Sequence, residues 1–364
     1  QGRVTMTSAN TTPGLVCAHH HLYSSLARGM PAPKIAPHHF LSVLENIWWK
    51  LDAALDHDMI YWSSALGAAE ALLSGTTAII DHHESPNCIE GSLDVIHAAC
   101  TDIGVRVIPC YGVTDRWNDD GKLQKVKASS PMTRGARLGF AETERYLATG
   151  KPAMVGVHAA FTCSDETLET ASELSTKFQT GVHIHVAEGP DDHGAETRLK
   201  KYAKDNWLIV HGVHLQEPIA GTIVHNPRSN MNNAVGYARP AQWTNRITLG
   251  SDGIDSNMMS EFQLAFVAGR ANDISFSPDL AWGWLFNGSQ LVPETQNDVV
   301  TWNYPHMDSS WHVAYTTSLH VTDVSINNEY VLSHGNLTKV DLEEIRRKAE
   351  EQSQRLHHAL AMSE

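Results

Sequence analysis

The sequence predicts an α/β protein built around a closed barrel of eight parallel strands. Eight short apolar runs occur, most of them separated by segments with helical spacing, as in successive βα units. The runs lack the polar alternation of a half-exposed strand, so we expect both faces of the sheet to be buried. A (β/α)8 TIM barrel is the natural closure of such a sheet. The predicted strands cover residues 14–21, 76–83, 106–112, 154–158, 181–188, 207–211, 221–227 and 246–252.

Helices are predicted between most of these strands. Residues 38–55 and 58–75 have helical spacing, and Gly75 suits the position just past a helix end. Ser164 is a plausible N-cap for a later helix. The connection 114–136 is polar, and residues 275–296 show no clear pattern. The further predicted helices cover residues 89–104, 137–149, 164–179 and 258–272.

The C-terminal part of the chain changes character and predicts a small β-rich accessory domain built from the chain ends. Alternating runs at 298–302, 318–326 and 330–332 are typical of strands, with a turn near Asn327 and Asn328. A charged helix, which we expect to be a solvated outer element, closes the chain. We divide the chain into a remnant of an N-terminal β segment (1–12), the barrel (13–296), a C-terminal β segment (297–339) and a C-terminal helix (340–364).

Composition and charge point to small-molecule partners. The formal net charge of −14 disfavours nucleic-acid binding, which requires a basic face. No run approaches the roughly 18 apolar residues of a membrane span, and the N-terminus lacks the order of a signal peptide. We therefore expect a cytoplasmic protein without a membrane partner. The 5 cysteines are scattered and form no Cys-x-x-Cys pair, which predicts buried free thiols.

Titratable side chains gather where the predicted strands end, and in a (β/α)8 barrel these ends carry the functional groups. His19 and His21 stand two residues apart, so both point to one side of an extended chain and can bind one metal ion. Any single histidine could instead be a hydrogen-bonded core residue. The other strand ends carry His82, His83, Glu84, His158, His185, Glu188, His211, His214, His225 and Asp252.

Five motifs, in order over residues 13–272, resemble the amidohydrolase superfamily. They begin at Pro13, His185, Val210, His225 and Gly250 and read PGLVCAHHH, HVAE, VHGVH, HNPRSNM and GSDG. Together they look like the mononuclear-metal aminohydrolase and chlorohydrolase branch, which includes guanine, cytosine and S-adenosylhomocysteine deaminases. Residues 81–83 and 226–234 make the sequence most similar to SsnA-type aminohydrolases. Family members usually have more β-structure before the first barrel strand than the twelve residues that precede Pro13, so we expect a reduced small β-domain or omitted segments.

The resemblance implies one divalent metal ion, Zn²⁺ or alternatively Fe²⁺, bound by His19, His21, His185 and Asp252. Asp252 would take the first proton from a metal-activated water. Glu188 would pass a proton to a ring nitrogen of the substrate and then to the leaving amine, and His211 would stabilise the charge that develops on the attacked carbon. Candidate substrate contacts are His158, His82, His83, Glu84 and Arg228.

We therefore expect a hydrolytic deaminase for an amino-substituted N-heterocycle of the purine, pyrimidine, pterin or triazine type, and a homo-oligomer, dimeric or larger. Chlorohydrolase or cyclic-amide hydrolysis is the alternative, although a two-metal cyclic-amide site usually needs a carboxylated lysine where His158 stands. Cytidine-deaminase chemistry is excluded because Pro109-Cys110 lacks a second cysteine three residues later. A barrel that binds metal without turnover is the non-enzyme alternative, and Glu188 and His211 argue against it.

Overall fold

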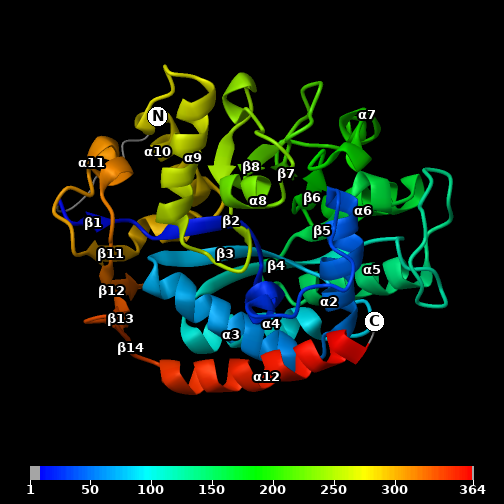
Figure 1. The fold of residues 1–364 in the computed structure, drawn as a ribbon, viewed down its shortest axis with the longest axis horizontal. Coiled ribbons are helices and arrows are strands. Elements are labelled where there is room, and N and C mark those ends of the chain that lie inside the picture. The colour runs from blue at the N-terminus through cyan, green and yellow to red at the C-terminus, as the bar shows by residue number, and fades with distance from the viewer. Residues whose placement is uncertain (1–8, 363–364) are drawn as a thin grey trace.

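The computed structural model describes residues 9–362 and contains one large parallel sheet and one small antiparallel sheet (Figure 1). Each strand of the large sheet runs parallel to its neighbours, in the order β10-β2-β3-β4-β5-β6-β7-β8-β9. The strands are β2 (Leu15–His21), β3 (Thr76–His83), β4 (Arg106–Val113), β5 (Val155–Ala159), β6 (Val182–Val186), β7 (Leu208–His211), β8 (Thr222–His225), β9 (Ile247–Leu249) and β10 (Asp252–Gly253).

The last predicted strand closes the barrel, although it is split into β9 and β10. β9 pairs with β8, whereas Asp252 in β10 lies opposite His20 in β2. Between the two halves, the Gly250 N–H donates to a β8 carbonyl at 3.0 Å and the Ser251 N–H donates to the His19 carbonyl at 3.1 Å. One strand thus joins both edges of the sheet, and the predicted TIM-barrel class is confirmed.

The strands are buried on both faces, as the apolar runs predicted. Every residue of β3, β5, β6, β7 and β8 is buried. The predicted helical segments form helices, and Ser164 caps α6 by accepting from the Thr167 N–H at 3.2 Å. The outer helices that follow barrel strands are α4 (Ser92–Ile103), α5 (Arg134–Leu147), α6 (Asp165–Lys177), α7 (Ala195–Leu199), α8 (Pro227–Asn232) and α9 (Met258–Asn272).

Two helical regions differ from the prediction. The segment predicted as one helix over 38–55 is α1 (Phe40–Val43), a π-helical turn (Leu44–Trp48) and α2 (Trp49–Ala54), followed by α3 (His57–Leu73). Residues 275–296, without a pattern in the sequence, contain α10 (Pro278–Asn287). This helix carries apolar residues on most of its positions, so it has no amphipathic stripe to detect. No helix among residues 9–362 combines the length and apolarity needed to span a bilayer.

The small sheet is formed by the two ends of the described chain. Its antiparallel strands are β1 (Thr11–Thr12), β11 (Val299–Trp302), β12 (Val321–Ile326), β13 (Glu329–Ser333) and β14 (Asn336–Leu337), in that order. Asn327 and Asn328 form the predicted turn, with φ of 53° and 65°. The short helix α11 (Ser310–Tyr315) lies between β11 and β12. The proposed boundaries at 12, 296 and 339 stay predictions, and their assignments to residues 1–8 and 363–364 fall outside the described residues.

The terminal helix α12 (Leu342–Met362) lies along α3 on the outside of the molecule (Figure 1). Its outer position agrees with the sequence, but one face is not solvated: Ile345, Ala349 and Leu356 are buried. The 5 cysteines are all free, and all except Cys88 are buried.

Asp81 in β3 provides a test of this packing. It is buried, and its Oδ1 accepts from the Leu22 N–H at 2.7 Å, at the point where the chain leaves β2. Burial raises the pKa of Asp81 to about 7. The folded chain therefore retains a proton that the unfolded chain releases near pH 4, and this carboxyl makes folding less favourable as pH rises from about 4 to about 7.

We expect Asp81→Asn to remove this dependence. Between pH 5 and pH 8 the variant should gain about 3 kcal/mol of unfolding free energy relative to the wild type, which is about 1.36 kcal/mol for each pH unit between 5 and 7. Urea denaturation of both proteins at the two pH values measures the difference. A constant difference would show that Asp81 is already ionised at pH 5.

Candidate metal centre and active-site cavity

Four side chains from three strands meet at the C-terminal end of the barrel. His19 and His21 come from β2, His185 from β6 and Asp252 from β10. The Oδ1 atom of Asp252 lies 3.0 Å from Nε2 of His19 and 3.1 Å from Nε2 of His21. The Nε2 atoms of His21 and His185 are 3.2 Å apart. These separations suit ligands that share one small cation at about 2.0–2.2 Å each.

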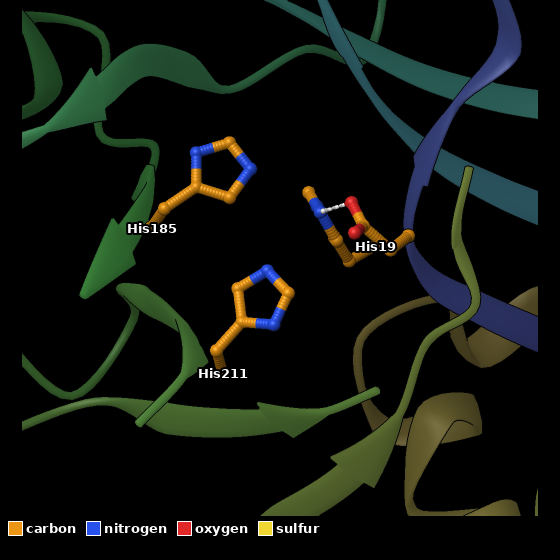
Figure 2. Close-up of side chains that lie close together, drawn as sticks. His19, His185 and His211 are labelled. Atoms are coloured by element: carbon orange, nitrogen blue, oxygen red, sulfur yellow. Dashed lines mark hydrogen bonds and ion pairs between the residues drawn. The ribbon is translucent and has the colours of Figure 1, made fainter. Parts of the chain in front are cut away.

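His211, at the end of β7, belongs to the same cluster. Figure 2 shows the imidazoles of His19, His185 and His211 turned toward one another, and a ligand atom from each of these and from Asp252 lies within 4.8 Å of the others. The sequence assigned His211 a role beside the metal. Its position also makes it a candidate ligand.

The ring orientation of two of these histidines is fixed by the backbone. Nδ1 of His21 donates to the carbonyl of His82, and Nδ1 of His185 donates to the carbonyl of His158, both at 2.6 Å. Because a carbonyl can only accept, the hydrogen of each neutral ring resides on Nδ1. Both Nε2 atoms therefore present a lone pair to the site, which is the form that binds a metal.

The charges at the site also suit a cation. Burial lowers the pKa of His19 and His185 well below the usual range, which keeps these rings neutral. Burial alone would raise the pKa of Asp252, but hydrogen bonds with His19 and His21 hold it well below its usual range. Burial lowers and the hydrogen bond to Asp252 raises the pKa of His21, which reaches about 9, so without a metal ion this ring carries a second proton, on Nε2, which a bound metal ion would replace. A carboxylate among imidazole lone pairs fits a divalent ion such as zinc.

The backbone is strained where the strands end at this cluster. His211 has φ of 70° and Asp252 has φ of 71°, in the left-handed region that non-glycine residues rarely adopt. Each such residue costs on the order of 1–3 kcal/mol. Strain of this kind clusters at functional sites, and here it occurs at two residues whose side chains reach the candidate metal centre.

Glu188 lies just beyond β6 and faces the same space. Its Oε2 is 3.5 Å from Nε2 of His211, and Asn233 also bonds its carboxyl group. Burial raises the pKa of Glu188 well above its usual range, and the nearby carboxylate of Asp252 raises it further. The raised pKa favours the protonated form of Glu188, which is the form that a general acid requires.

The helix α8 connects these groups, and its role was missed in the sequence. Ser229 donates to Oδ2 of Asp252 at 2.5 Å, and Asn233 donates to Ser229 at 3.2 Å. Asn230 accepts from Nδ1 of His211 at 2.8 Å. The run of serine and asparagine directly after a barrel strand was the available signal, since short polar side chains there can reach the strand ends.

A cavity of about 410 Å³ opens onto the cluster. Phe40, Trp48 and Trp49, from the irregular helical segment 40–54, line one wall. Phe161 adds a fourth ring, and Glu188 lies on the polar part of the lining. Aromatic walls beside a few convergent polar groups suit a planar heterocycle.

The predicted substrate contacts differ in their access to this cavity. His158 and Arg228 line it, although Arg228 Nε also pairs with Glu261 of α9 at 2.7 Å. His82 and His83 are fully buried and do not line the cavity. His83 instead bonds the Ser85 hydroxyl at 2.9 Å. Direct substrate contact therefore has geometric support for His158 and Arg228 and none for His82 or His83.

A buried ion-pair network on the cavity wall was also missed. Arg116 bonds Asp52 at 2.7 Å and contacts Glu84, and its guanidinium stacks over Trp49 at 4.9 Å. Burial and the neighbouring Glu84 raise the pKa of Asp52 to about 8. Both carboxyl groups line the cavity. Only Glu84 stood out in the sequence, because Asp52 lies within a helix and Arg116 within the polar connection.

Comparison with known sequences relates this chain to hydrolases. The sequence model of the Amidohydrolase family matches residues 10–279. The 5'-deoxyadenosine deaminase of Methanocaldococcus jannaschii is 26% identical, over 93% of this chain and 87% of that protein. The 5-methylthioadenosine/S-adenosylhomocysteine deaminase of Thermoanaerobacter pseudethanolicus is 26% identical, over 95% of this chain and 86% of that protein.

Solved structures share the fold. An adenosine deaminase from Xanthomonas campestris with bound zinc has a TM-score of 0.78 at 20% identity, and the match covers 96% of this chain and 86% of that one. A zinc complex of atrazine chlorohydrolase from Arthrobacter aurescens has a TM-score of 0.74 at 17% identity, with coverage of 94% and 88%.

The bond from Ser229 to Asp252 gives a direct test of the site. We expect Ser229→Ala to weaken zinc binding by about tenfold, because Asp252 loses the group that fixes its Oδ2. Competition with a chelator measures the affinity. Ser175→Ala is the matched control, since it also removes a buried serine that donates one hydrogen bond, but in α6. Equal zinc affinities for the two variants would rule out this role of Ser229.

Proposed function

The chain belongs to the amidohydrolase family, and from this premise we propose that it is a metal-dependent hydrolase that removes an amino group from a purine of the adenosine type. The observation that carries the proposal is a buried glutamate, Glu188, whose pKa is raised and which lies beside the convergent candidate metal ligands and an aromatic-lined cavity. The names of the relatives support the adenosine-type substrate.

The metal would be held by His19, His21, His185 and Asp252, with His211 close by. When bound there, a divalent ion supplies a water whose pKa is lowered toward neutrality. We infer zinc rather than iron, because three imidazole nitrogens and one carboxylate oxygen suit zinc and similar folds contain it. A homo-oligomeric state stays a prediction.

The side chains of Asp252 and Glu188 would transfer the protons of the reaction. Asp252 accepts the proton that the attacking water loses, and the bond from Ser229 to Oδ2 fixes the orientation of this carboxyl group. Glu188 donates its proton to a ring nitrogen of the substrate, takes up the second proton of the attacking water as the carbon–oxygen double bond forms, and passes it to the leaving amine. The proton held by Asp252 then restores Glu188. No hydrogen bond from residues 9–362 reaches Nε2 of the buried His211. Because Nδ1 of His211 donates to Asn230, Nε2 carries a lone pair and would accept a hydrogen bond from the attacking water, which holds that water in place.

The cavity supports a substrate with a flat ring and a hydroxyl-bearing substituent. The aromatic wall would stack on the purine. Asp52 and Glu84 line another part of the cavity, and Oδ1 of Asp52 has no hydrogen-bond partner within residues 9–362. These carboxyl groups can bond the hydroxyls of a sugar.

Chlorohydrolase chemistry is the second candidate, because atrazine chlorohydrolase shares the fold. The raised pKa of Glu188 favours deamination instead. Ammonia leaves only after the amine receives a proton, whereas chloride leaves without one. A buried carboxylic acid beside the candidate metal centre is therefore more useful for the first reaction.

We expect Glu188→Gln to lower the rate of ammonia release by at least about a hundredfold, because the amide keeps the shape but carries no transferable proton. Adenosine, 5'-deoxyadenosine, S-adenosylhomocysteine, guanine, cytosine and an amino-triazine form the substrate panel. Zinc content should remain unchanged in the variant. Full activity of Glu188→Gln would remove this residue from the mechanism, and a wild type inert on all six compounds would refute the proposed reaction.

Metal removal gives an independent test. The purified wild type should contain about one metal ion per chain, because the candidate ligands surround one position. Treatment with a chelator should abolish ammonia release, and added Zn²⁺ should restore it while Mg²⁺ should not, since Mg²⁺ prefers oxygen ligands. Activity that survives complete removal of the metal contradicts the proposal.

A further inference from the structure

We propose that His183, in β6, is a positioning residue that sets the hydrogen position on His19 and thereby the metal affinity of the site. This inference rests on the metal centre of the proposed function and names a residue on which it depends. His183 stands two residues before His185, so the two side chains point to the same side of the strand. Nε2 of His183 lies 2.8 Å from Nδ1 of His19, and both rings are fully buried.

Metal binding requires a particular arrangement of hydrogens in this pair. His19 can offer a lone pair on Nε2 only if its hydrogen lies on Nδ1, and this hydrogen must then be donated to His183. Nε2 of His183 must therefore accept, so His183 carries its own hydrogen on Nδ1. That atom lies 3.5 Å from Sγ of Cys110, which can accept it. The three groups form one chain that runs from His19 to Cys110.

The same chain can also run in the opposite direction. If the Cys110 thiol donated to His183, then Nε2 of His183 would carry a hydrogen and donate it to His19. The hydrogen of His19 would then lie on Nε2, which would block its lone pair. Only one direction is compatible with metal binding, and His183, which is not a candidate ligand, is the member that bonds His19 directly.

His19 differs in this respect from the other candidate ligands of β2 and β6. His21 and His185 donate to backbone carbonyls, which can only accept and which no substitution removes. His19 depends instead on a side chain that can either accept or donate. Because His183 does not line the cavity, its replacement leaves the substrate contacts in place.

Three substitutions of His183 separate its role as a hydrogen-bond acceptor for His19 from its contribution to the packing of the barrel interior. In His183→Gln the side-chain oxygen can reach the place of Nε2 and still accept from His19. In His183→Asn the amide is too short to do so, and His183→Phe fills the space without an acceptor. His225→Phe is the control, because His225, the last residue of β8, is also a buried barrel histidine, and no hydrogen bond from residues 9–362 reaches its ring.

Zinc affinity of the metal-free full-length proteins, measured by chelator competition, is the readout. We expect His183→Phe and His183→Asn to weaken zinc binding by about 10–100-fold. His183→Gln and His225→Phe should stay close to the wild type. The cobalt-loaded Phe variant should also show an altered visible spectrum, because one nitrogen ligand is misdirected.

Several results would overturn the inference. One is wild-type affinity in a folded His183→Phe, and another is equal weakening by Gln and Phe, which would indicate packing rather than an acceptor. If urea denaturation shows that the Phe variant does not fold, the comparison of Gln with Asn decides. A wild type that binds no zinc would refute the metal centre itself, which distinguishes that failure from a failure of the role of His183.

Discussion

The site depends on the place where the barrel closes, which is where the split last strand, β9 and β10, meets β2. Asp252 is far from His19 and His21 in the sequence, yet it lies beside them because β10 pairs with β2 in a fixed register, with Asp252 opposite His20. A shift of this register by one residue would turn the Asp252 side chain to the other face of the sheet. The hydrogen bonds of Gly250 and Ser251 to the two neighbouring strands hold the register.

A second layer of hydrogen bonds gives the histidines their function. A buried imidazole is only a potential ligand, and the atom that bonds its Nδ1 decides whether Nε2 has a free lone pair. Backbone carbonyls do this for His21 and His185, and side chains do it for His19 and His211. In two of these histidines the backbone thus fixes the position of the ring hydrogen, and in the other two this position depends on neighbouring side chains.

The sequence predicted those features of the fold and the site that depend on the residues of a single strand. Apolar runs predicted the barrel strands, and the residue at the end of each run predicted which groups would meet. The alternation of side chains along a strand also separates His82, whose ring lies beside those of His21 and His185, from its neighbour His83, which bonds Ser85. Contacts between distant loops leave no comparable pattern. The pair of Arg116 with Asp52 becomes visible only when these segments are placed in space.

Gly250 sets a limit on how this barrel can be changed. A side chain at this position would begin 2.4 Å from Oδ1 of Asn226 and 2.9 Å from Cβ of His19, so even alanine would wedge the two edges of the sheet apart. This separation of the two edges would occur two residues before Asp252. Attempts to redesign this enzyme for other substrates therefore have wide freedom in the aromatic segment over the cavity and almost none along this narrow line of contact.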